Sequence, residues 1–465
     1  QNIFVSDEMY EITKFVMNVI THSQDQNTND LFKSLVFLGR SPMELGLTTH
    51  KVSDGNVYKT IKFFNEVERK KNEYVSYYFD SILDENTTNQ NIQQKYIELI
   101  NRLSSLDEAE MQLINKTLYP DSSIENIQKK LQENEVLSFN FKFLILGNDY
   151  MINMIIDQND YEIKIHNLSH ILGQSIDDYF FEFEEMLFSN FVNQDNIDLI
   201  KLEDISYLFL PKNVDVYEKI TFITNFFDSF NSNLLRHKNS WIIENYEIKN
   251  YFSIANFLND AQSSKQNVEK YIGFGDVDYS RHQENFFKLP ETRDEINESS
   301  KFFKSRKVFL GKDANETKLN SLDFKDSVIH FATHTNNPYL SLMPDPALVL
   351  SPSKSADGYL SIFEISDLNF SESHIILAAC DTDASITTDF DYMSGLVKSF
   401  VLSGAKSLLA TKWDIETTTA KEITIQYSNL LSQSNNPQQS IQSIQNKLIS
   451  KGIHPYIWSG YFVVN

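Results

Sequence analysis

Two strand-like runs decide the fold: Val328-Ile-His-Phe-Ala-Thr-His334 and His374-Ile-Ile-Leu-Ala-Ala-Cys380. Each run is short and mostly apolar, and each ends in a chemically competent side chain. His334 ends the first run, and Cys380 ends the second run 46 positions later (380 − 334 = 46). The carboxyl ends of strands in an open parallel sheet share one edge, where ligands bind. The two runs therefore predict that an imidazole and a thiol meet at that edge as a Cys-His dyad.

Each of these two residues also has a structural interpretation when it is taken alone. Cys380 is the only cysteine of the chain, and free cysteines usually act as small buried hydrophobes. A lone histidine on a strand is likewise more often structural than catalytic. As partners at the ends of two strands they favour chemistry, because an imidazole within reach takes the thiol proton or stabilises the thiolate.

Composition excludes several classes of partner. The formal net charge of −23 argues against a nucleic-acid groove or an anionic membrane surface, since both require clustered Lys and Arg. With 41% hydrophobic residues in 465, the chain can bury a sizeable core in two or three domains. No run approaches the ~18 apolar residues of a membrane span. One cysteine cannot form an intrachain disulfide, which fits a cytoplasmic location.

The first part of the chain reads as a helical region, residues 1–133. Apolar residues recur at helical spacing over 59–83 and 91–106, and a short helix is expected over 123–132. Tetratricopeptide-type repeats and an irregular helical domain both fit this pattern, and the choice stays open. The chain begins with Gln1 and without a leader, so we expect a fragment or a processed product.

From residue 134 the pattern changes to strands. Segments 136–146 and 150–156 flank the turn Gly147-Asn148-Asp149 and predict a hairpin. Further strands are expected over 206–210, 221–227 and 241–246. After Lys270 strands and helices alternate, which predicts an α/β fold with a mostly parallel sheet flanked by helices. The expected elements are strands at 271–274, 307–310 and 347–350, helices at 291–303 and 313–322, the latter with an Asp cap, and a short helix near Ile362 after the turn Asp357-Gly358.

The segment after Cys380 predicts a helix that packs back on the sheet. Met393, Leu396, Val397, Phe400 and Val401 fall on one helical face. Gly404 stands where this helix should end, and the next strand is expected over 407–411. Backbone N–H groups at the turn after Cys380 could therefore face a developing oxyanion.

Four landmarks in order resemble a CHAT domain, a family of caspase-related peptidases that is also similar to separases. They are His330-Phe-Ala-Thr-His334, Ile375-Ile-Leu-Ala-Ala-Cys380-Asp-Thr, Ser403-Gly-Ala-Lys-Ser-Leu-Leu-Ala-Thr-Lys-Trp413 and His454-Pro-Tyr-Ile-Trp458. The stretches Asp357-Gly358-Tyr-Leu, Gly273-Phe-Gly-Asp276 and Leu289-Pro290-Glu291-Thr292 fit the same pattern. The resemblance covers residues 136–465 and implies a caspase-like domain over 134–465, with a pseudo-half at 134–265 and a catalytic half at 266–465.

The resemblance implies a cysteine endopeptidase in which His334 is the base or proton donor and Cys380 the nucleophile. The oxyanion would be held by the backbone N–H groups of Cys380 and Thr335. Thr335 stands where the family usually has Gly, and Asp383 replaces the usual Gly three positions past the cysteine. These two departures bear on how closely a substrate approaches and on the conformation of the loop.

Substrate recognition has several candidate residues. Asp381 and Asp383 belong to an acidic loop that could read a basic substrate, although a solvated loop explains most of its charge. Trp413 and Asp414 resemble a separase pair whose aspartate is linked to choosing arginine before the cut; for Asp414 a helix cap before Glu416 is the alternative. A calcium loop beginning at Asp381 is rejected, because Ile386 and Tyr392 occupy its Gly and Glu positions. We expect no metal and no cofactor.

Three other histidines are not expected to be the catalytic base. His374 begins the strand that ends at Cys380, roughly 20 Å from the thiol at ~3.3 Å per residue, so it cannot be the base. His330 is expected to pack inside the sheet. His454 begins the last landmark, which we interpret as a closing strand with Trp458 and Tyr461 in the core.

Two kinds of function follow from these residues and from the resemblance. The first is an endopeptidase that cleaves a protein partner and is activated through the helical region by a protein partner or signal. The resemblance adds bacterial defence, since some relatives are effectors of RNA-guided systems. No direct nucleic-acid or membrane binding is expected. The rivals are a caspase-like scaffold without activity, and a thiol-dependent acyl transferase or redox sensor.

Overall fold

The computed structural model describes residues 123–145, 148–193, 199–224, 226, 230–260, 268–282, 284–336, 346–378 and 390–465. Residues 131–252 and 259–465 form one compact unit, and α7 (Ile124–Lys130) and nearly all of α12 (Ile254–Asn259) fall outside it. The helix α7 confirms the expectation for 123–132. The helices expected over 59–83 and 91–106, and any repeats there, lie outside the described residues.

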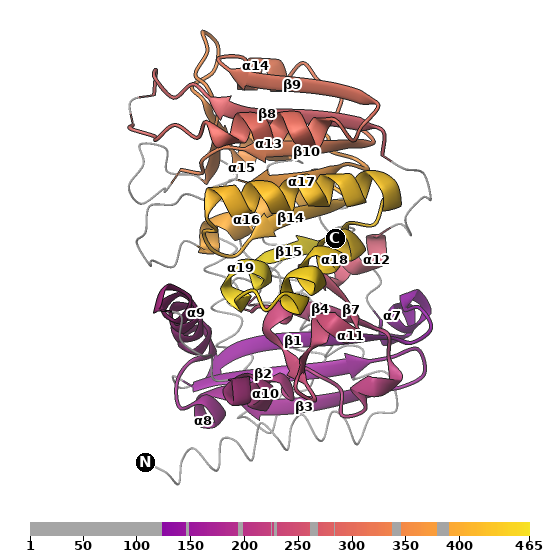
Figure 1. Ribbon diagram of the computed structural model, residues 1–465. Coiled ribbons are helices and arrows are strands. Elements are labelled where there is room, and N and C mark those ends of the chain that lie inside the picture. The colour runs from indigo at the N-terminus through magenta and orange to yellow at the C-terminus, as the bar shows by residue number, and fades with distance from the viewer. Residues whose placement is uncertain are drawn as a thin grey trace. The chain divides into compact units, whose positions relative to one another are not determined.

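The larger sheet is mostly parallel. Its strand order within the described residues is β15-β14-β13-β10-β8-β9, and every neighbouring pair is parallel except β14 with β15. The strands, most of which are labelled in Figure 1, are β8 (Lys270–Val277), β9 (Ser305–Gly311), β10 (Ser327–Ala332), β13 (His374–Ala378), β14 (Ser407–Thr411) and β15 (Tyr461–Val464). The continuous apolar runs of β10 and β13 suit this place, because central parallel strands are covered on both faces. The expected fold class, a parallel-rich sheet flanked by helices, is confirmed.

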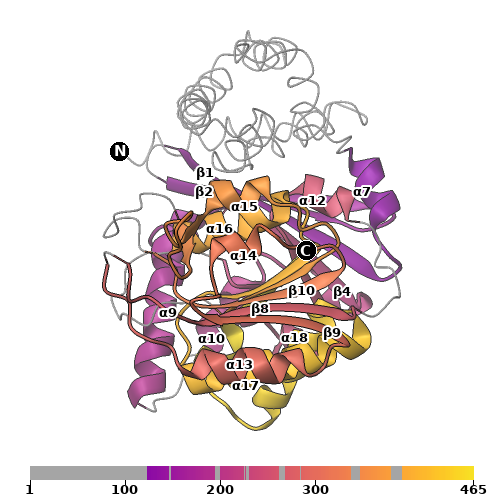
Figure 2. The same cartoon turned by 90° about the horizontal axis from the view of Figure 1, so that it is seen from above.

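Helices cover both faces of this sheet (Figure 2). On one side lie α13 (Glu291–Ser300) and α17 (Thr417–Ser434), with α18 (Pro437–Ser450) packed on α17. The other side carries α15 (Ile362–Asp367) and α16 (Phe390–Leu402). The predicted apolar face of α16 is buried at Leu396, Val397 and Phe400, and the Phe400 ring lies 5.8 Å from that of Phe331 on β10. Gly404 adopts a φ of +94° just beyond the helix, which explains the stop.

A second, mixed sheet has the order β3-β2-β1-β4-β7. Its strands are β1 (Glu135–Ile145), β2 (Asn148–Ile156), β3 (Tyr161–Asn167), β4 (Lys219–Thr224) and β7 (Glu247–Tyr251). The predicted hairpin is the antiparallel pair of β1 and β2. Around it lie the helices α8 (Leu168–Leu172), α9 (Ile176–Asn193), α10 (Leu199–Ser206) and α11 (Ile242–Asn245), the short helices η1 (Val214–Val216) and η2 (Ser232–Leu234), and the two-residue strands β5 (Arg236–His237) and β6 (Ser240–Trp241).

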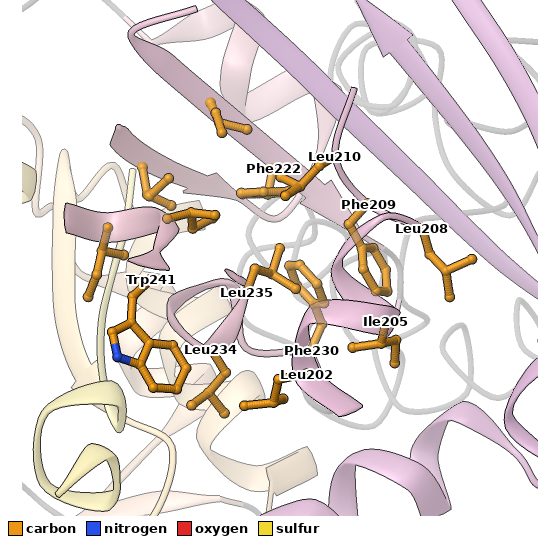
Figure 3. Packing of buried hydrophobic residues seen from close by; sticks show 14 of the residues in the cluster. Leu202, Ile205, Leu208, Phe209, Leu210, Phe222, Phe230, Leu234, Leu235 and Trp241 are labelled. Carbon is orange, nitrogen blue, oxygen red and sulfur yellow. The ribbon is translucent and has the colours of Figure 1, made fainter. Parts of the chain in front are cut away.

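An aromatic core fills one side of the second sheet (Figure 3). Phe209 and Phe230 lie at its centre with ring centroids 4.8 Å apart, and Phe222 of β4 packs on Phe230 at 5.5 Å. Each of these rings is at most 1% exposed. Full burial of side chains of this size stabilises the fold by about 1.5–3 kcal/mol each.

Hydrogen bonds join the two sheets at β7 and β15. The backbone N–H of Asn465 donates to the Asn250 carbonyl over 3.1 Å. The buried amide of Asn233 donates to the carbonyls of Tyr461 (2.6 Å) and Ser459 (3.1 Å). The Asn233 amide satisfies backbone carbonyls just before and at the start of β15, so the C-terminal strand depends on a side chain of η2.

Four local expectations were wrong. Residues 206–210 form the end of α10 and a turn rather than a strand, and 241–246 are mostly α11. The helix expected over 313–322 is only α14 (Glu316–Leu319), capped by Asn315 and not by an aspartate. The segment after His454 is the helix α19 (Pro455–Ser459), and the closing strand is β15. Trp458 and Tyr461 are buried as expected.

Candidate active site

The strand order changes direction between β8 and β10. The chain passes from β8 to β9 on one side, and then crosses back to β10 on the other side of β8. Ligands bind in open α/β sheets beyond the carboxyl ends of the strands at such a switch point. At this edge the loop after β8 meets the residues that follow β10, and His334 lies there.

His334 is buried beyond the end of β10 and is held by a backbone carbonyl. It is 2% exposed, and its Nε2 lies 2.8 Å from the carbonyl oxygen of Phe287. A carbonyl only accepts hydrogen bonds, so Nε2 carries the hydrogen. In the neutral imidazole Nδ1 is then the basic nitrogen, which is the nitrogen that can take a proton.

Aromatic rings from the loop after β8 fix the plane of the His334 ring. Phe286 stacks on it with centroids 5.8 Å apart at 29°, and Tyr279 lies 5.2 Å away. The Tyr279 hydroxyl is 2.8 Å from Oγ1 of Thr333, which in turn donates to the carbonyl of Val349. The imidazole therefore packs against two aromatic rings in a defined orientation.

Thr335 presents its backbone N–H away from a supporting hairpin. This hairpin consists of β11 (Ala347–Val349) and β12 (Tyr359–Ser361). Thr335 pairs with Leu348 in an antiparallel bridge, and the bonds beside the bridge use Val349 N–H to His334 O (2.8 Å) and Asn336 N–H to Ala347 O (3.1 Å). In such a non-hydrogen-bonded pair the N–H of the paired residue points to the opposite side. The Thr335 N–H is thus directed away from β11.

The register of β10 and β13 brings the two decisive runs side by side. Val328 pairs with His374 and Ala332 with Ala378, a constant offset of 46 (374 − 328 = 46). One further hydrogen bond lies just beyond β10: the Thr333 N–H donates to the Ala378 carbonyl over 3.2 Å. The same offset separates His334 from Cys380. Cys380, Asp381 and Asp383 lie outside the described residues.

Trp413 and Asp414 follow the carboxyl end of β14, on the same edge of the sheet. The Trp413 Nε1–H donates to the Tyr456 carbonyl over 2.8 Å, and the two rings stack at 5.5 Å and 16°. The Tyr456 hydroxyl donates to the backbone carbonyl of Asp414 over 3.0 Å. The alternative of Asp414 as a helix cap was wrong, because Glu416 is the N-cap of α17.

Glu416 illustrates why the cap lies two residues later. Its carboxylate accepts from the N–H groups of Thr418 (3.0 Å) and Thr419 (2.8 Å). These hydrogen bonds outweigh its partial desolvation and lower the pKa of Glu416 to about 2. The cap is therefore ionised at neutral pH and favourable to the positive end of the helix.

His330 and His374 have structural contacts. His330 is fully buried, with Nε2 3.0 Å from Oε1 of Glu295. His374 contacts Ser407 Oγ (2.7 Å) and Asn435 Oδ1 (3.0 Å) at the start of β13. Burial, with a smaller effect of Lys406, lowers the pKa of His374 to about 4, so this imidazole is neutral. Both results agree with the roles expected from the sequence.

Several residues at this edge escaped the sequence analysis. Phe287 acts through its carbonyl, which any residue possesses, so no local signal marked it. Lys412 is 5% exposed with its Nζ 5.1 Å over the Phe462 ring. Glu184 of α9 is its electrostatic neighbour, and burial raises the pKa of Glu184 to about 7 although Lys412 opposes the rise. The only sequence signal was the position of Lys412 directly after a buried strand.

A buried carboxyl group supports the hairpin that carries the bridge to Thr335. Glu316 is 3% exposed and its Oε1 accepts from Gly358 N–H over 2.8 Å. Gly358 has a φ of +93°, and a Cβ there would come within 2.7 Å of the Leu350 carbonyl oxygen, so only glycine fits. Burial, reinforced by Glu364 and Asp357, raises the pKa of Glu316 to about 7.

The raised pKa of Glu316 predicts a specific pH dependence of stability. In the unfolded chain this carboxyl ionises near its ordinary 4.5, whereas in the folded chain it ionises near 7. Stability is therefore lost as pH rises between these values. Glu316→Gln keeps an acceptor for Gly358 and should remove about 2 kcal/mol of this loss. Urea unfolding at pH 5 and pH 8 measures it, with exposed Glu298→Gln as control; an equal pH dependence in both variants would refute the assignment.

The described residues contain no cluster of three His, Cys, Asp or Glu side chains arranged to hold a metal ion. Among the helices built from these residues, none has the length and apolarity needed to cross a bilayer.

The sequence and the structure were compared with known proteins. No curated protein matches the sequence. Gingipain R, an Arg-specific cysteine proteinase, is similar in structure with a TM-score of 0.34 and 8% identity, over 56% of this chain and 66% of that chain. The separase-securin complex of Saccharomyces cerevisiae gives a TM-score of 0.41 and 10% identity, over 78% of this chain and 32% of that chain. The complex of the pro- and mature domains of RgpB from Porphyromonas gingivalis gives 0.33 and 8%, over 60% and 70%.

The comparison of sequence families is decisive. The model of the CHAT domain matches residues 224–465, which are 242 of the 465 residues (465 − 224 + 1 = 242). This range contains β8 to β15 and with them His334, Cys380 and Asp414. With more than half of its length matched in this way, the chain belongs to the CHAT domain family.

Proposed function

We propose that this chain is a cysteine endopeptidase that cleaves a protein partner through His334 and Cys380. The observation that carries the proposal is the register of β10 and β13. Its offset of 46 equals the spacing between the two residues. If the pairing continues by two residues past Ala332 and Ala378, the two Cα atoms lie about 5 Å apart on neighbouring strands. Imidazole and thiol are then within reach of one proton transfer.

The proposed reaction uses the orientation of His334. Nδ1 takes the proton of the Cys380 thiol, and the thiolate attacks the carbonyl carbon of the scissile peptide bond. The Thr335 and Cys380 N–H groups stabilise the resulting oxyanion. When the C–N bond breaks, His334 returns the proton to the leaving amine. Water, deprotonated by the same imidazole, hydrolyses the thioester and releases the second product.

A cleavage assay tests the reaction. A degenerate peptide library is incubated with the full chain and analysed by mass spectrometry. We expect cut peptides with the wild-type chain and none with Cys380→Ala, because the acyl intermediate cannot form. Identical cleavage by both proteins, or by neither, would favour a caspase-like scaffold without activity.

We further propose that Asp414 selects a basic residue before the cut. Support comes from its place beyond β14 on the same edge as His334, its backbone fixed by Tyr456, and the loss of its alternative role as a cap. Trp413, Asp381 and Asp383 complete the proposed substrate contacts. Asp414→Asn should reduce kcat/KM for peptides with Arg before the cut by about 100-fold, since a charge-assisted contact is lost. Unchanged preference for Arg in this variant would contradict the role.

The proposed organisation assigns residues 1–133 to a helical regulatory region and 134–465 to the caspase-like peptidase domain, with halves at 134–265 and 266–465. A protein activator would act through the helical region, and the acidity of the chain favours a protein over bare nucleic acid. A role as a bacterial defence effector is part of this proposal. Equal cleavage by the isolated 134–465 segment and by the full chain would argue against regulation through the helices.

A further inference from the structure

A row of stacked rings runs from the candidate site to an exposed surface. Trp413 stacks on Tyr456 at 5.5 Å and 16°, and Tyr456 stacks on Phe191 of α9 at 5.3 Å and 19°. Phe188 adds a ring 5.4 Å from Tyr456, and His454 one 5.6 Å from Phe191. We call the surface formed by Phe188, Phe191, Val192, His454 and Tyr456 the aromatic shelf.

The shelf exposes apolar side chains that the fold could have buried. Phe188 is 39% exposed, Phe191 37% and Val192 60%, although the same helix buries Phe180, Phe183 and Leu187. Exposed apolar residues gathered in one place mark an interaction site more often than scattered ones. The shelf also contacts the candidate site directly. The Tyr456 hydroxyl donates a hydrogen bond to the Asp414 carbonyl, and the Tyr456 carbonyl accepts one from the Trp413 indole N–H.

The charges around the shelf restrict its partner. The sequence of α9 contains five acidic residues and no Lys, Arg or His. Glu185, which is exposed, lies one turn before Phe188 and two turns before Val192, on the same side of the helix. His454 adds no positive charge, since burial lowers its pKa and its Nδ1 accepts from the N–H of Tyr456. On its α9 side the shelf thus has an acidic border, formed by Glu185, while Lys451 is exposed three residues before His454.

We infer that the aromatic shelf binds a segment of the protein substrate in which apolar or aromatic side chains alternate with Lys or Arg. This inference rests on the proposed function and extends it from the cleaved bond to a second contact region. Apolar side chains of the segment pack on Phe188 and Phe191, and its basic residues pair with the acidic border. An anionic membrane or a nucleic acid would be repelled by that border. A second copy would place acidic helices against each other in a chain of net charge −23.

The test selects ligands without assuming their sequence. Displayed random 12-residue peptides are selected on the full chain carrying Cys380→Ala, which cannot cleave them, and selected peptides are synthesised with a fluorophore for anisotropy titration. We expect enrichment of Lys or Arg together with aromatic residues.

The double variant Phe188→Ser/Phe191→Ser should raise Kd for these peptides at least about 10-fold, as loss of two central aromatic contacts does. Glu185→Lys should also raise it, and added salt should weaken binding.

The matched control is Phe302→Ser. Phe302 is 38% exposed, like the shelf rings, but it precedes β9 and so lies at the opposite edge of the sheet. Its substitution should leave Kd unchanged. Acidic enrichment, no enrichment, or equal Kd in the double variant and the control would overturn the inference. Binding is measured on the Cys380→Ala chain, so the result does not depend on whether the wild type cleaves the peptide library. The binding experiment therefore tests the aromatic shelf, and the cleavage assay separately tests the proposed peptidase activity.

Discussion

Alkylation of the full chain by iodoacetamide at pH 7 is expected to slow by about 10²-fold or more when His334 is replaced by alanine. The chain has one cysteine, so the label reports Cys380 alone. In the proposed dyad, the imidazole lets the thiol ionise below its ordinary pKa of about 8.5. Without it, both general-base assistance and stabilisation of the thiolate are lost, and such assistance is worth about 10²–10⁴ in rate.

The pH profile separates an activated thiol from a merely accessible one. Wild-type labelling should already be fast at pH 6–7, whereas His334→Ala should label with a profile that rises only toward pH 8.5. His170→Ala is the matched control, because His170 is exposed on α8, far along the chain from β10. Equal rates and profiles in wild type, His170→Ala and His334→Ala would remove the dyad and favour the scaffold.

The imidazole also depends on groups that hold it. Its Nε2 is fixed by the Phe287 carbonyl and its ring by Phe286 and Tyr279. None of these contacts had a sequence signature. A backbone acceptor 47 residues away can be any residue, and aromatic residues in a loop have many structural uses. The sequence pattern could place His334 at the end of a strand, but only the fold of the following loop decides which ring nitrogen is basic.

The strands β10 and β13 could be predicted because their residues are almost all apolar. β10 and β13 are covered on both faces, so their apolar runs are continuous and short. The two strands pair in parallel with an offset of 46 residues in the structure. This offset equals the spacing between His334 and Cys380 in the sequence. The helix α16 could also be predicted from the sequence, because its apolar side chains recur at helical spacing and Gly404 follows its end.

The segments that were misjudged depend on contacts from elsewhere. Residues 241–246 are rich in apolar and aromatic residues, which favours a strand. Glu244, however, accepts from the N–H of the N-cap residue Trp241 over 2.8 Å at the start of the short helix α11. The segment after His454 was predicted to be a closing strand. His454 caps α19 instead, through its Nδ1 and the Tyr456 N–H. In both cases one side-chain to backbone bond outweighs local propensity.

Breaking the buried pair of Glu295 and His330 is expected to be the most damaging substitution for stability. Glu295 is 2% exposed and its Oε1 accepts from His330 Nε2 (3.0 Å) and from the Thr424 hydroxyl (2.7 Å). His330 Nδ1 then accepts from the Tyr271 hydroxyl over 2.8 Å. Burial and the nearby Glu295 hold the pKa of Tyr271 well above its ordinary value, so the phenol keeps the proton that it donates.

This network ties four elements together beneath the candidate site: β8, β10, α13 and α17. Glu295→Ala removes the shared acceptor and leaves the buried imidazole and hydroxyl without it, which should cost about 3–5 kcal/mol in urea unfolding. Glu295→Gln retains an oxygen acceptor and should cost about 1–2 kcal/mol. A loss below about 1 kcal/mol for Glu295→Ala would show that the network contributes little.

The same variants distinguish support from catalysis. His330 lies four residues before His334 on β10, at ~3.3 Å per residue roughly 13 Å away, so it cannot exchange a proton with Cys380. Well below the urea concentration at which the variant unfolds, iodoacetamide should therefore alkylate Cys380 of Glu295→Gln at the wild-type rate and with the wild-type pH profile. The variant should nevertheless unfold at a lower urea concentration than the wild type. A shifted labelling profile in the folded variant would instead mean that the buried pair tunes the basicity of His334 through the backbone that joins the two histidines. Stability and reactivity are thus expected to separate, because one network holds the sheet and the other orients the imidazole at its edge.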